Sequence, residues 1–308
     1  MKKTFITLVM LLAAFTLTAQ EKKINFSKGT VQICTSAKIN ISGYDGKQVV
    51  IKGNSPDNFF YRNTNNSFII SGQNSQGLTT VDSISGIYFS DFSRDKEEKA
   101  KGLKPLGSGE DEDSTPIDQH FEIQLSGDNL LIRDKSYNTP NEAHVFFYSN
   151  NTYEILVPNS VKLMVTTSDC NEEKNPQRFI FSSDALKVAS FEGQLQVNSK
   201  YKAVDLTDVS GPALVNTLGG DVKVVFAKKR PNKLFSIISN DGDIDITMTP
   251  ESKVTVSIAA QEVLSNLDFK LLTENFVNNQ KIIKAELNGG GKTFDLKTDY
   301  GTVYLRKN

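Results

Sequence analysis

The sequence predicts an all-β protein, an irregular single-stranded β-solenoid of short strands joined by glycine turns, with a β-sandwich or meander as the alternative. One phrase recurs five times in the second half of the 308-residue chain, as SFEGQLQV, DVSGPALV, TLGGDVKV, SNDGDIDI and TDYGTVYL. Aliphatic residues alternate with other residues on both sides of each glycine, which is the period of strands that bury one face. Repetition favours a stacked β architecture, and the uneven spacing fits an irregular solenoid better than a propeller with equal blades.

The turn of each phrase has the same chemistry. A Ser, Thr or Asp stands three residues before a glycine in every copy, and these glycines are Gly193, Gly211, Gly220, Gly242 and Gly301. We expect glycine there because it adopts a positive φ without a Cβ clash, and the short oxygen-bearing side chain should hydrogen-bond the turn backbone. Ile244 and Val303, which follow two of the glycines, should face inward, where burial of each is worth roughly 1.5 to 3 kcal/mol.

Residues 1–19 have the three parts of a secretory signal. Lys2 and Lys3 precede an apolar run from Phe5 to Phe15, and Thr-Leu-Thr-Ala ends the segment before Gln20. The run is shorter than the ~20 residues that a membrane-spanning helix needs, so cleavage after Ala19 is favoured over a single anchor. We expect an exported protein, in the periplasm or at the cell surface, with no stable membrane span after cleavage.

The N-terminal strand region, residues 20–90, consists of short alternating runs separated by glycines. Its aromatic triplet, Phe59, Phe60 and Tyr61, could stack on a sugar, although packing against the sheet is the simpler interpretation. Residues 91–118 combine clustered charge with few apolar side chains, which predicts a flexible excursion. The acidic run from Glu110 to Asp113 could bind a cation loosely, but nothing fixes its geometry, so a solvated loop is favoured.

Strands resume in the C-terminal repeat region, residues 119–308. The segment FEIQL alternates cleanly from Phe121, and Pro158 ends a later strand. A short helix between Ala259 and Leu272 is an alternative to strands there, opposed by β-branched residues before it and by Asn266 within it.

The cysteines and histidines limit the chemistry that is available. Cys34 and Cys170 are the only thiols, and an oxidising envelope permits a disulfide between them, with two buried free thiols as the alternative. Their spacing is not that of a redox or zinc motif. His120 and His144 are the only histidines, so a centre with many histidine ligands is excluded.

Three carboxylates in SNDGDID resemble a calcium loop or the acids of a polysaccharide-cleaving β-helix. They are Asp241, Asp243 and Asp245, and the EF-hand pattern of a sixth-position glycine and twelfth-position glutamate is not met. Asp243 and Asp245 would share one side of a strand, as paired acids for glycosidic chemistry require, although solubilising outward residues are the favoured interpretation. Asp221 resembles one unit of a calcium-binding nonapeptide repeat, but successive copies are absent.

A glycine-rich run from Gly289 to Thr293 invites comparison with a phosphate-binding loop. The first glycine of a Walker A motif would stand where this chain has Glu286, and the following residues alternate like a strand rather than opening a helix. A turn into a strand is sufficient. We assign no catalytic, cofactor-binding or metal-binding residue and expect no cofactor.

Four segments together resemble the bacterial putative-adhesin family of β-strand repeats, the heads of auto-transporter-like adhesins. They are SNDGDIDI, TDYGTVYL, YEILVPNSVKLMVTTSD and LNGGGKTFDLKTDYGTVYLRKN. The resemblance spans most of residues 120–308 and is weaker in the N-terminal strands. It implies an exported β-solenoid head with an adhesive or scaffolding role and offers no catalytic residues. The glutamine after the signal and the glycine-rich loop tips resemble envelope proteins of the Bacteroides group.

These observations lead to one expected function and two alternatives. With 35 basic and 36 acidic side chains the chain is nearly neutral, which argues against nucleic acid as a partner. We expect a non-enzymatic adhesin or envelope scaffold that binds an envelope protein or a glycan and can self-associate through open strand edges. The alternatives are a β-helix carbohydrate-active enzyme, a lyase or glycosidase, and an envelope-stress accessory that docks a partner through residues 91–118.

Overall fold

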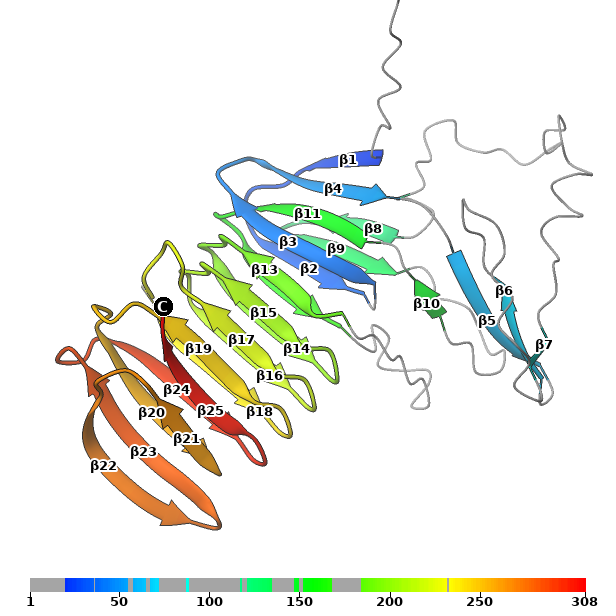
Figure 1. The fold of residues 1–308 in the computed structure, drawn as a ribbon. Helices are drawn as coiled ribbons and strands as arrows, with labels where there is room; N and C mark the ends of the chain where they lie inside the picture. Colours follow the sequence, from blue (N-terminus) through cyan, green and yellow to red (C-terminus); the bar gives the residue numbers. More distant parts are fainter. Residues whose placement is uncertain are drawn as a thin grey trace, which may run out of the picture.

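The structure, a computed structural model, describes residues 20–35, 37–54, 58–64, 67–71, 87–88, 117, 121–134, 147–149, 152–167, 184–231 and 233–308. Every secondary-structure element described there is a β-strand, which confirms the all-β prediction (Figure 1). The signal segment 1–19 and nearly all of the excursion 91–118 lie outside the described residues. Ile117, the one described residue of that excursion, is buried in the core.

The strands form two large mixed sheets and one small sheet. Sheet A runs in the order β1 (Gln20–Asn25), β4 (Gln48–Asn54), β11 (Thr152–Pro158), β3 (Lys38–Tyr44), β13 (Leu186–Ala189), β15 (Val204–Thr207), β17 (Val222–Val225), β19 (Ile244–Met248), β25 (Thr302–Lys307), β21 (Glu262–Ser265). Sheet B runs β22 (Lys270–Val277), β23 (Gln280–Leu287), β20 (Val254–Ala260), β24 (Lys292–Thr298), β18 (Phe235–Ser239), β16 (Ala213–Thr217), β14 (Gln194–Ser199), β12 (Lys162–Thr166), β2 (Thr30–Cys34), β9 (Asn129–Asp134), β8 (Phe121–Ser126). The small sheet joins β10 (Phe147–Ser149), β5 (Asn58–Thr64), β6 (Ser67–Ser71) and β7 (Ile87–Tyr88).

Sheets A and B face each other over a single core, an arrangement that fits the β-sandwich alternative (Figure 1). From β12 to β21 consecutive strands alternate between the two sheets. We call one sheet-B strand, its corner and the following sheet-A strand a repeat. Within each sheet, most of these strands pair in parallel with a strand of a neighbouring repeat. Antiparallel pairs form the edges of the stack: β1 with β4 in sheet A and the hairpin β8–β9 in sheet B at one end, and the hairpin β22–β23 of sheet B at the other.

The last repeat of the sequence is not the last repeat of the stack. Strands β24 and β25 lie between β18–β19 on one side and β20–β21 on the other, in both sheets. Phe294 of β24 pairs with Phe235 of β18 and with Val256 of β20, so the C-terminal strands fill a gap between earlier ones. The disfavoured option of a short helix from Ala259 to Leu272 is wrong, because this segment holds the end of β20, the whole of β21 and the start of β22.

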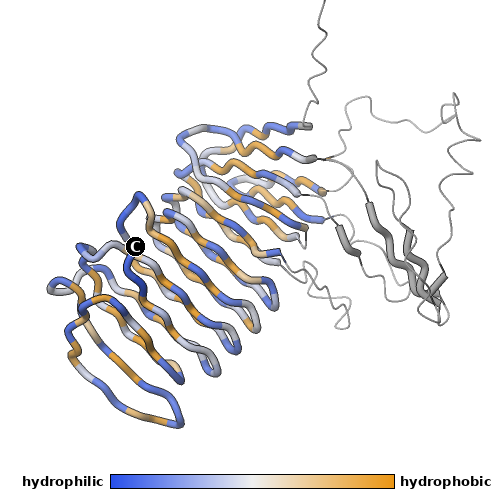
Figure 2. Tube along the Cα trace, viewed as in Figure 1, coloured by the Kyte–Doolittle hydropathy of each residue, from blue (hydrophilic) through white to orange (hydrophobic). Residues whose placement is uncertain are grey.

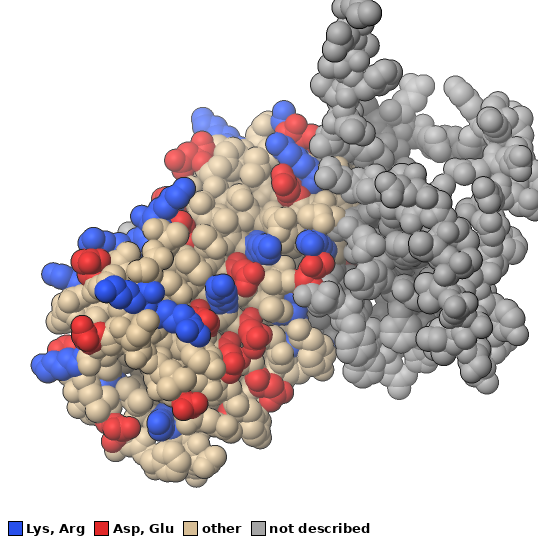
Figure 3. All heavy atoms as spheres, viewed as in Figure 1, with Lys and Arg blue, Asp and Glu red and all other residues tan. Residues whose placement is uncertain are grey.

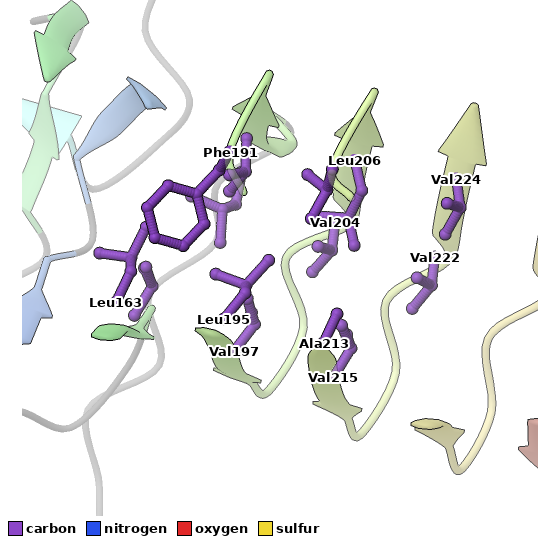
Figure 4. Close-up of a cluster of buried hydrophobic side chains, with 14 of the residues drawn as sticks. Leu163, Phe191, Leu195, Val197, Val204, Leu206, Ala213, Val215, Val222 and Val224 are labelled. Atoms are coloured by element: carbon purple, nitrogen blue, oxygen red, sulfur yellow. The ribbon is translucent and has the colours of Figure 1, made fainter. Parts of the chain in front are cut away.

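The core consists of in-register ladders of aliphatic and aromatic side chains. Figure 4 shows how Val204 and Leu206 of one sheet face Leu195 and Val197 of the other. Ile244 and Val303 occupy one such ladder and are both completely buried, which confirms the inward assignment made from the alternation. Figure 2 shows the same pattern along the whole stack, with hydrophobic stretches on the strands and hydrophilic ones at many of the corners.

The repeated glycines are required for a different reason from the one predicted. The described glycines with positive φ are Gly29, Gly127, Gly289 and Gly290, and none belongs to the recurring phrase. Instead, a Cβ at Gly242 would lie 2.4 Å from the carbonyl oxygen of Gly220, and one at Gly301 would lie 2.4 Å from that of Gly242. Neighbouring repeats approach so closely at these corners that a side chain has no room, so the positive-φ explanation was wrong.

The recurring phrase also combines two different corners. Thr217, Ser239 and Thr298 mark corners from sheet B to sheet A, where their buried hydroxyls bond turn backbone as predicted: Thr217 Oγ1 donates to Gly220 O at 2.8 Å and Thr298 Oγ1 to Gly242 O at 2.9 Å. Ser190 and Asp208 mark corners from sheet A to sheet B and themselves adopt positive φ, 55° and 53°. Asp208 Oδ1 accepts the backbone N–H groups of residues 228 and 229 in the next repeat.

Candidate binding surface

Four consecutive corners from sheet B to sheet A stack into a continuous ridge. We define this corner ridge as residues 199–203, 217–221, 239–243 and 298–302. Backbone hydrogen bonds hold the corners in register: Gly219 N–H donates to Lys200 O at 2.7 Å, Asp241 N–H to Leu218 O at 3.1 Å, and Tyr300 N–H to Asn240 O at 3.0 Å. Since neighbouring strands lie about 4.8 Å apart, equivalent corner residues recur at about that interval.

The four positions of each corner have separate roles. The first residue, a Ser or Thr, is buried and bonded, and the fourth contacts the neighbouring repeat. The second position is exposed or half-buried and the third is exposed. Three large exposed side chains stand at these two positions: Tyr201 (55% exposed), Leu218 (43%) and Tyr300 (67%). The third position reads Tyr201, Gly219, Asp241 and Tyr300 along the ridge. The ridge therefore presents exposed aromatic and apolar groups on a rigid backbone.

The carboxylates singled out from the sequence mostly tie repeats together. Asp221 Oδ1 accepts the N–H of Asp243 at 2.9 Å, and Asp243 Oδ1 accepts the N–H of Thr302 at 2.7 Å. Both carboxylate oxygens of Asp245 lie 2.9 Å from Arg306 Nε, so this acid is held by an ion pair across adjacent strands. The geometry therefore gives Asp243 and Asp245 structural partners, consistent with the favoured interpretation of outward-facing residues.

Asp241 is exposed on the ridge, like Asp221, and its Oδ1 accepts the Asn240 side-chain amide at 3.0 Å. No group of three or more His, Cys, Asp or Glu side chains in the described part of the chain is arranged to hold a metal ion.

Lys202 takes the fourth corner position, where the next three repeats have glycine, and sequence reasoning missed it. Its side chain is buried, only 6% exposed, and Nζ donates to the backbone oxygen of Ala37 at 3.0 Å. Burial lowers the pKa of Lys202 from 10.5 to about 8, although the carboxylates of Asp184 and Asp134 act in the opposite direction. The sequence does contain a signal for this buried lysine: residues 199–202, SKYK, match the Ser-x-x-Gly pattern of the other corners, with lysine in place of glycine.

The glycine run after Leu287 is a turn, as predicted. Gly289 and Gly290 adopt φ of 78° and 77° between β23 and β24, and a Cβ at Gly291 would lie 2.2 Å from Lys253 O. The residues after it form strand β24 rather than a helix. A Walker A loop is therefore excluded at this position.

Several sequence candidates lie outside the described residues. His120, His144 and the run from Glu110 to Asp113 are among them, and Phe59 to Tyr61 belong to β5, whose side chains are not described. Cys34 is disulfide-bonded. The chain has only one other cysteine, Cys170, which lies outside the described residues.

Two further surface features lie near the end of the stack that carries β22. Strand β22 is exposed along its length, and its large apolar side chains are Leu271, Leu272, Phe276 and Val277. A hollow of about 520 Å³ lies where the turns before β20 and after β21 meet the ends of β23 and β25, and it is lined by charges of both signs, including Glu251, Lys253, Asp268 and Lys307. On the face seen in Figure 3, basic and acidic side chains intermingle over the described surface. No helix in the described ranges is long and apolar enough to cross a membrane.

Comparisons with known proteins found distant structural neighbours. No protein-family model and no curated protein matches the chain. The crystal structure of a putative cell adhesion protein from Clostridium sporogenes ATCC 15579 is 12% identical, with 94% of this chain and 99% of that chain covered and a TM-score of 0.40. That of a putative adhesin from Bacteroides fragilis NCTC 9343 is 8% identical, with 94% and 96% covered and a TM-score of 0.34. At these scores, a function for this chain must be argued from its own residues.

Proposed function

We propose that the protein is an exported, non-enzymatic adhesin or envelope scaffold, built as a single-stranded β-solenoid that binds its partner along the corner ridge. The in-register stacking of the ridge corners is the observation that carries this proposal. In each corner the first and fourth positions are buried and hold the turn together, whereas the third position is exposed on a backbone fixed by hydrogen bonds. A rigid row of this kind can contact an extended partner without losing much conformational entropy.

The contacts of Asp243 and Asp245 support a binding role over catalysis. A retaining or inverting glycosidase needs one carboxyl group that gives up a proton and a second that attacks or activates water. Asp243 already accepts a backbone N–H, and Asp245 is already paired with Arg306. No described observation favours the enzyme, and the accessory role depends on residues 91–118, of which only Ile117 is described.

A retention assay tests the proposal. The purified chain from Gln20 to Asn308 is applied to a glycan array and to immobilised envelope extracts, with reducing-sugar release measured in the same wells. We expect retention without sugar release, and we expect Leu218→Arg on the ridge to weaken retention. Leu125→Arg is the matched control, because Leu125 is also an exposed leucine but lies in β8, the edge strand of sheet B, away from the ridge.

The outcomes separate the binding role from the alternatives. Sugar release that is lost in Asp243→Asn with an unchanged melt would establish the enzyme instead. Equal effects of the two arginine substitutions would place the binding face away from the ridge.

A further inference from the structure

Two tyrosines occupy equivalent positions on the corner ridge and are among the most exposed large side chains described. Tyr201 and Tyr300 both stand third in their corners and are 55% and 67% exposed. The Tyr201 ring lies along the ridge, because a Cβ at the neighbouring Gly219 would be 3.3 Å from Tyr201 Cδ1. Glycine at that position leaves room for the ring to rest against the backbone. A large part of the ring remains accessible to a ligand.

The register fixes how far apart the two rings lie. Their corners are separated by those of residues 217–221 and 239–243, so the step between them is three strand spacings, or about 14 Å. The sugar rings of an extended polysaccharide follow one another at a spacing close to that between repeats. A short run of sugars therefore spans both tyrosines, and the apolar C–H face of a pyranose stacks on an aromatic ring.

Hydrogen-bonding groups occupy the space between the two rings. Asp241 and Asn240 lie in the intermediate corner, joined by their own side-chain hydrogen bond, and both have further capacity to bond sugar hydroxyls. Asp221 adds a second exposed carboxylate in the other intermediate corner. Like charges repel, so this stretch disfavours sulfated or uronic-acid polysaccharides and leaves a neutral chain as the complementary partner.

We infer that the corner ridge binds a neutral, extended polysaccharide, with Tyr201 and Tyr300 as its two stacking platforms and Asp241 and Asn240 as hydrogen-bonding groups between them. The inference rests on the proposed binding role of the ridge and names its ligand class. The two tyrosines contact separate sugars of one chain. Binding should therefore strengthen with oligosaccharide length until the chain reaches both rings.

Affinity electrophoresis tests this inference with defined probes. The chain from Gln20 to Asn308 is run in native gels that contain hydroxyethylcellulose, xylan, galactomannan or, as the anionic probe, heparin. We expect retardation by at least one neutral polymer and none by heparin. Tyr201→Ala and Tyr300→Ala should each weaken binding by about two- to tenfold, and the double variant should lose retardation. Phe276→Ala is the matched control, since this exposed aromatic lies in β22, away from the ridge.

Thermal melts of all variants establish that the fold is retained, as expected for exposed side chains. Unchanged retardation of the double variant, or an equal loss in Phe276→Ala, would overturn the inference. Retardation by heparin comparable to that by the neutral polymers would also overturn it. If the chain instead binds an envelope protein through the ridge and no glycan, the inference fails while the proposed function stands. Retention on neither probe would refute both.

Discussion

Replacing one glycine of the adjacent pair Gly219–Gly220 should separate close packing from backbone conformation as the reason for glycine in these corners. Neither residue has a positive φ. A Cβ at Gly220 would lie 2.4 Å from Lys202 O and 2.7 Å from Lys202 C, which are backbone atoms and cannot rotate away. A Cβ at Gly219 would lie 3.3 Å from the Tyr201 ring, which can move, and 3.9 Å from Lys200 O, an ordinary contact distance. The two alanine variants thus differ in the contact that the new methyl group makes.

The structure sets the size of the effect. Ordinary contact begins near 3.4 Å, so Gly220→Ala must push adjacent repeats apart by about 1 Å at this corner. Overpacking of this kind costs about 1 to 3 kcal/mol. The shift also disturbs the hydrogen bond from Thr217 Oγ1 to Gly220 O, which is worth about 0.5 to 1.5 kcal/mol. Alanine reduces the entropy of the unfolded chain and returns about 0.4 to 1 kcal/mol, so we expect a net loss centred on about 2 kcal/mol, within a range of about 0.5 to 4 kcal/mol.

Thermal unfolding followed by far-UV circular dichroism measures the difference. A loss of about 2 kcal/mol corresponds to a decrease in Tm of roughly 4 to 8 °C for Gly220→Ala. Gly219→Ala should melt at or slightly above the wild-type temperature. A wild-type Tm for Gly220→Ala would refute the close-approach argument. A similar decrease for both variants would show that glycine is needed for its backbone conformation.

Two further predictions concern the inserted repeat and the buried lysine. Ending the chain at Leu287 removes β24 from between β18 and β20 and β25 from between β19 and β21, so cooperative thermal unfolding should be lost. A truncated chain with the wild-type melt would contradict the observed strand order. The pKa of Lys202 is about 8 in the folded protein and 10.5 when the side chain is fully solvated. Between these pH values the unfolded chain binds a proton that the folded chain lacks, so the free energy of unfolding should rise with pH across that window, by about 3 kcal/mol. Lys202→Met should remove this rise from urea unfolding curves recorded at pH 8 and pH 10, and an unchanged slope would show that Lys202 is not its source.

The strands were predictable because burial of one sheet face leaves a local signature. Ile244 and Ile246 alternate with Asp245 and Thr247, and the structure buries the first pair while leaving the second partly exposed. The order of the repeats leaves no such signature. Phe294 and Leu296 have the same alternation wherever their repeat stands in the stack, so nothing local reports that β24 lies between β18 and β20.

The corners were only half predictable for a related reason. A hydroxyl three residues before a glycine indicates a bonded turn, and Thr217, Ser239 and Thr298 form such turns. The sequence does not report which atoms lie against the glycine, because these belong to a different repeat. A glycine that is required by close approach between repeats therefore cannot be told from the sequence apart from one that is required by a positive φ. For the same reason Lys202, which replaces glycine at one corner, could be recognised as buried only after its neighbours were placed.

The four positions of a corner differ in what they contribute to the fold, and this difference connects the fold to the proposed binding role. The first and fourth positions are fixed by hydrogen bonds and by contact between repeats, so substitution there costs stability, as Gly220→Ala should demonstrate. The second and third positions contribute backbone hydrogen bonds, which any residue except proline supplies. Tyr201 and Tyr300 stand at such positions and are more than half exposed, so burial of their rings contributes little to the stability of the fold. An exposed aromatic that contributes little to stability is a reason to look for a ligand, and the stack places two of them in one row.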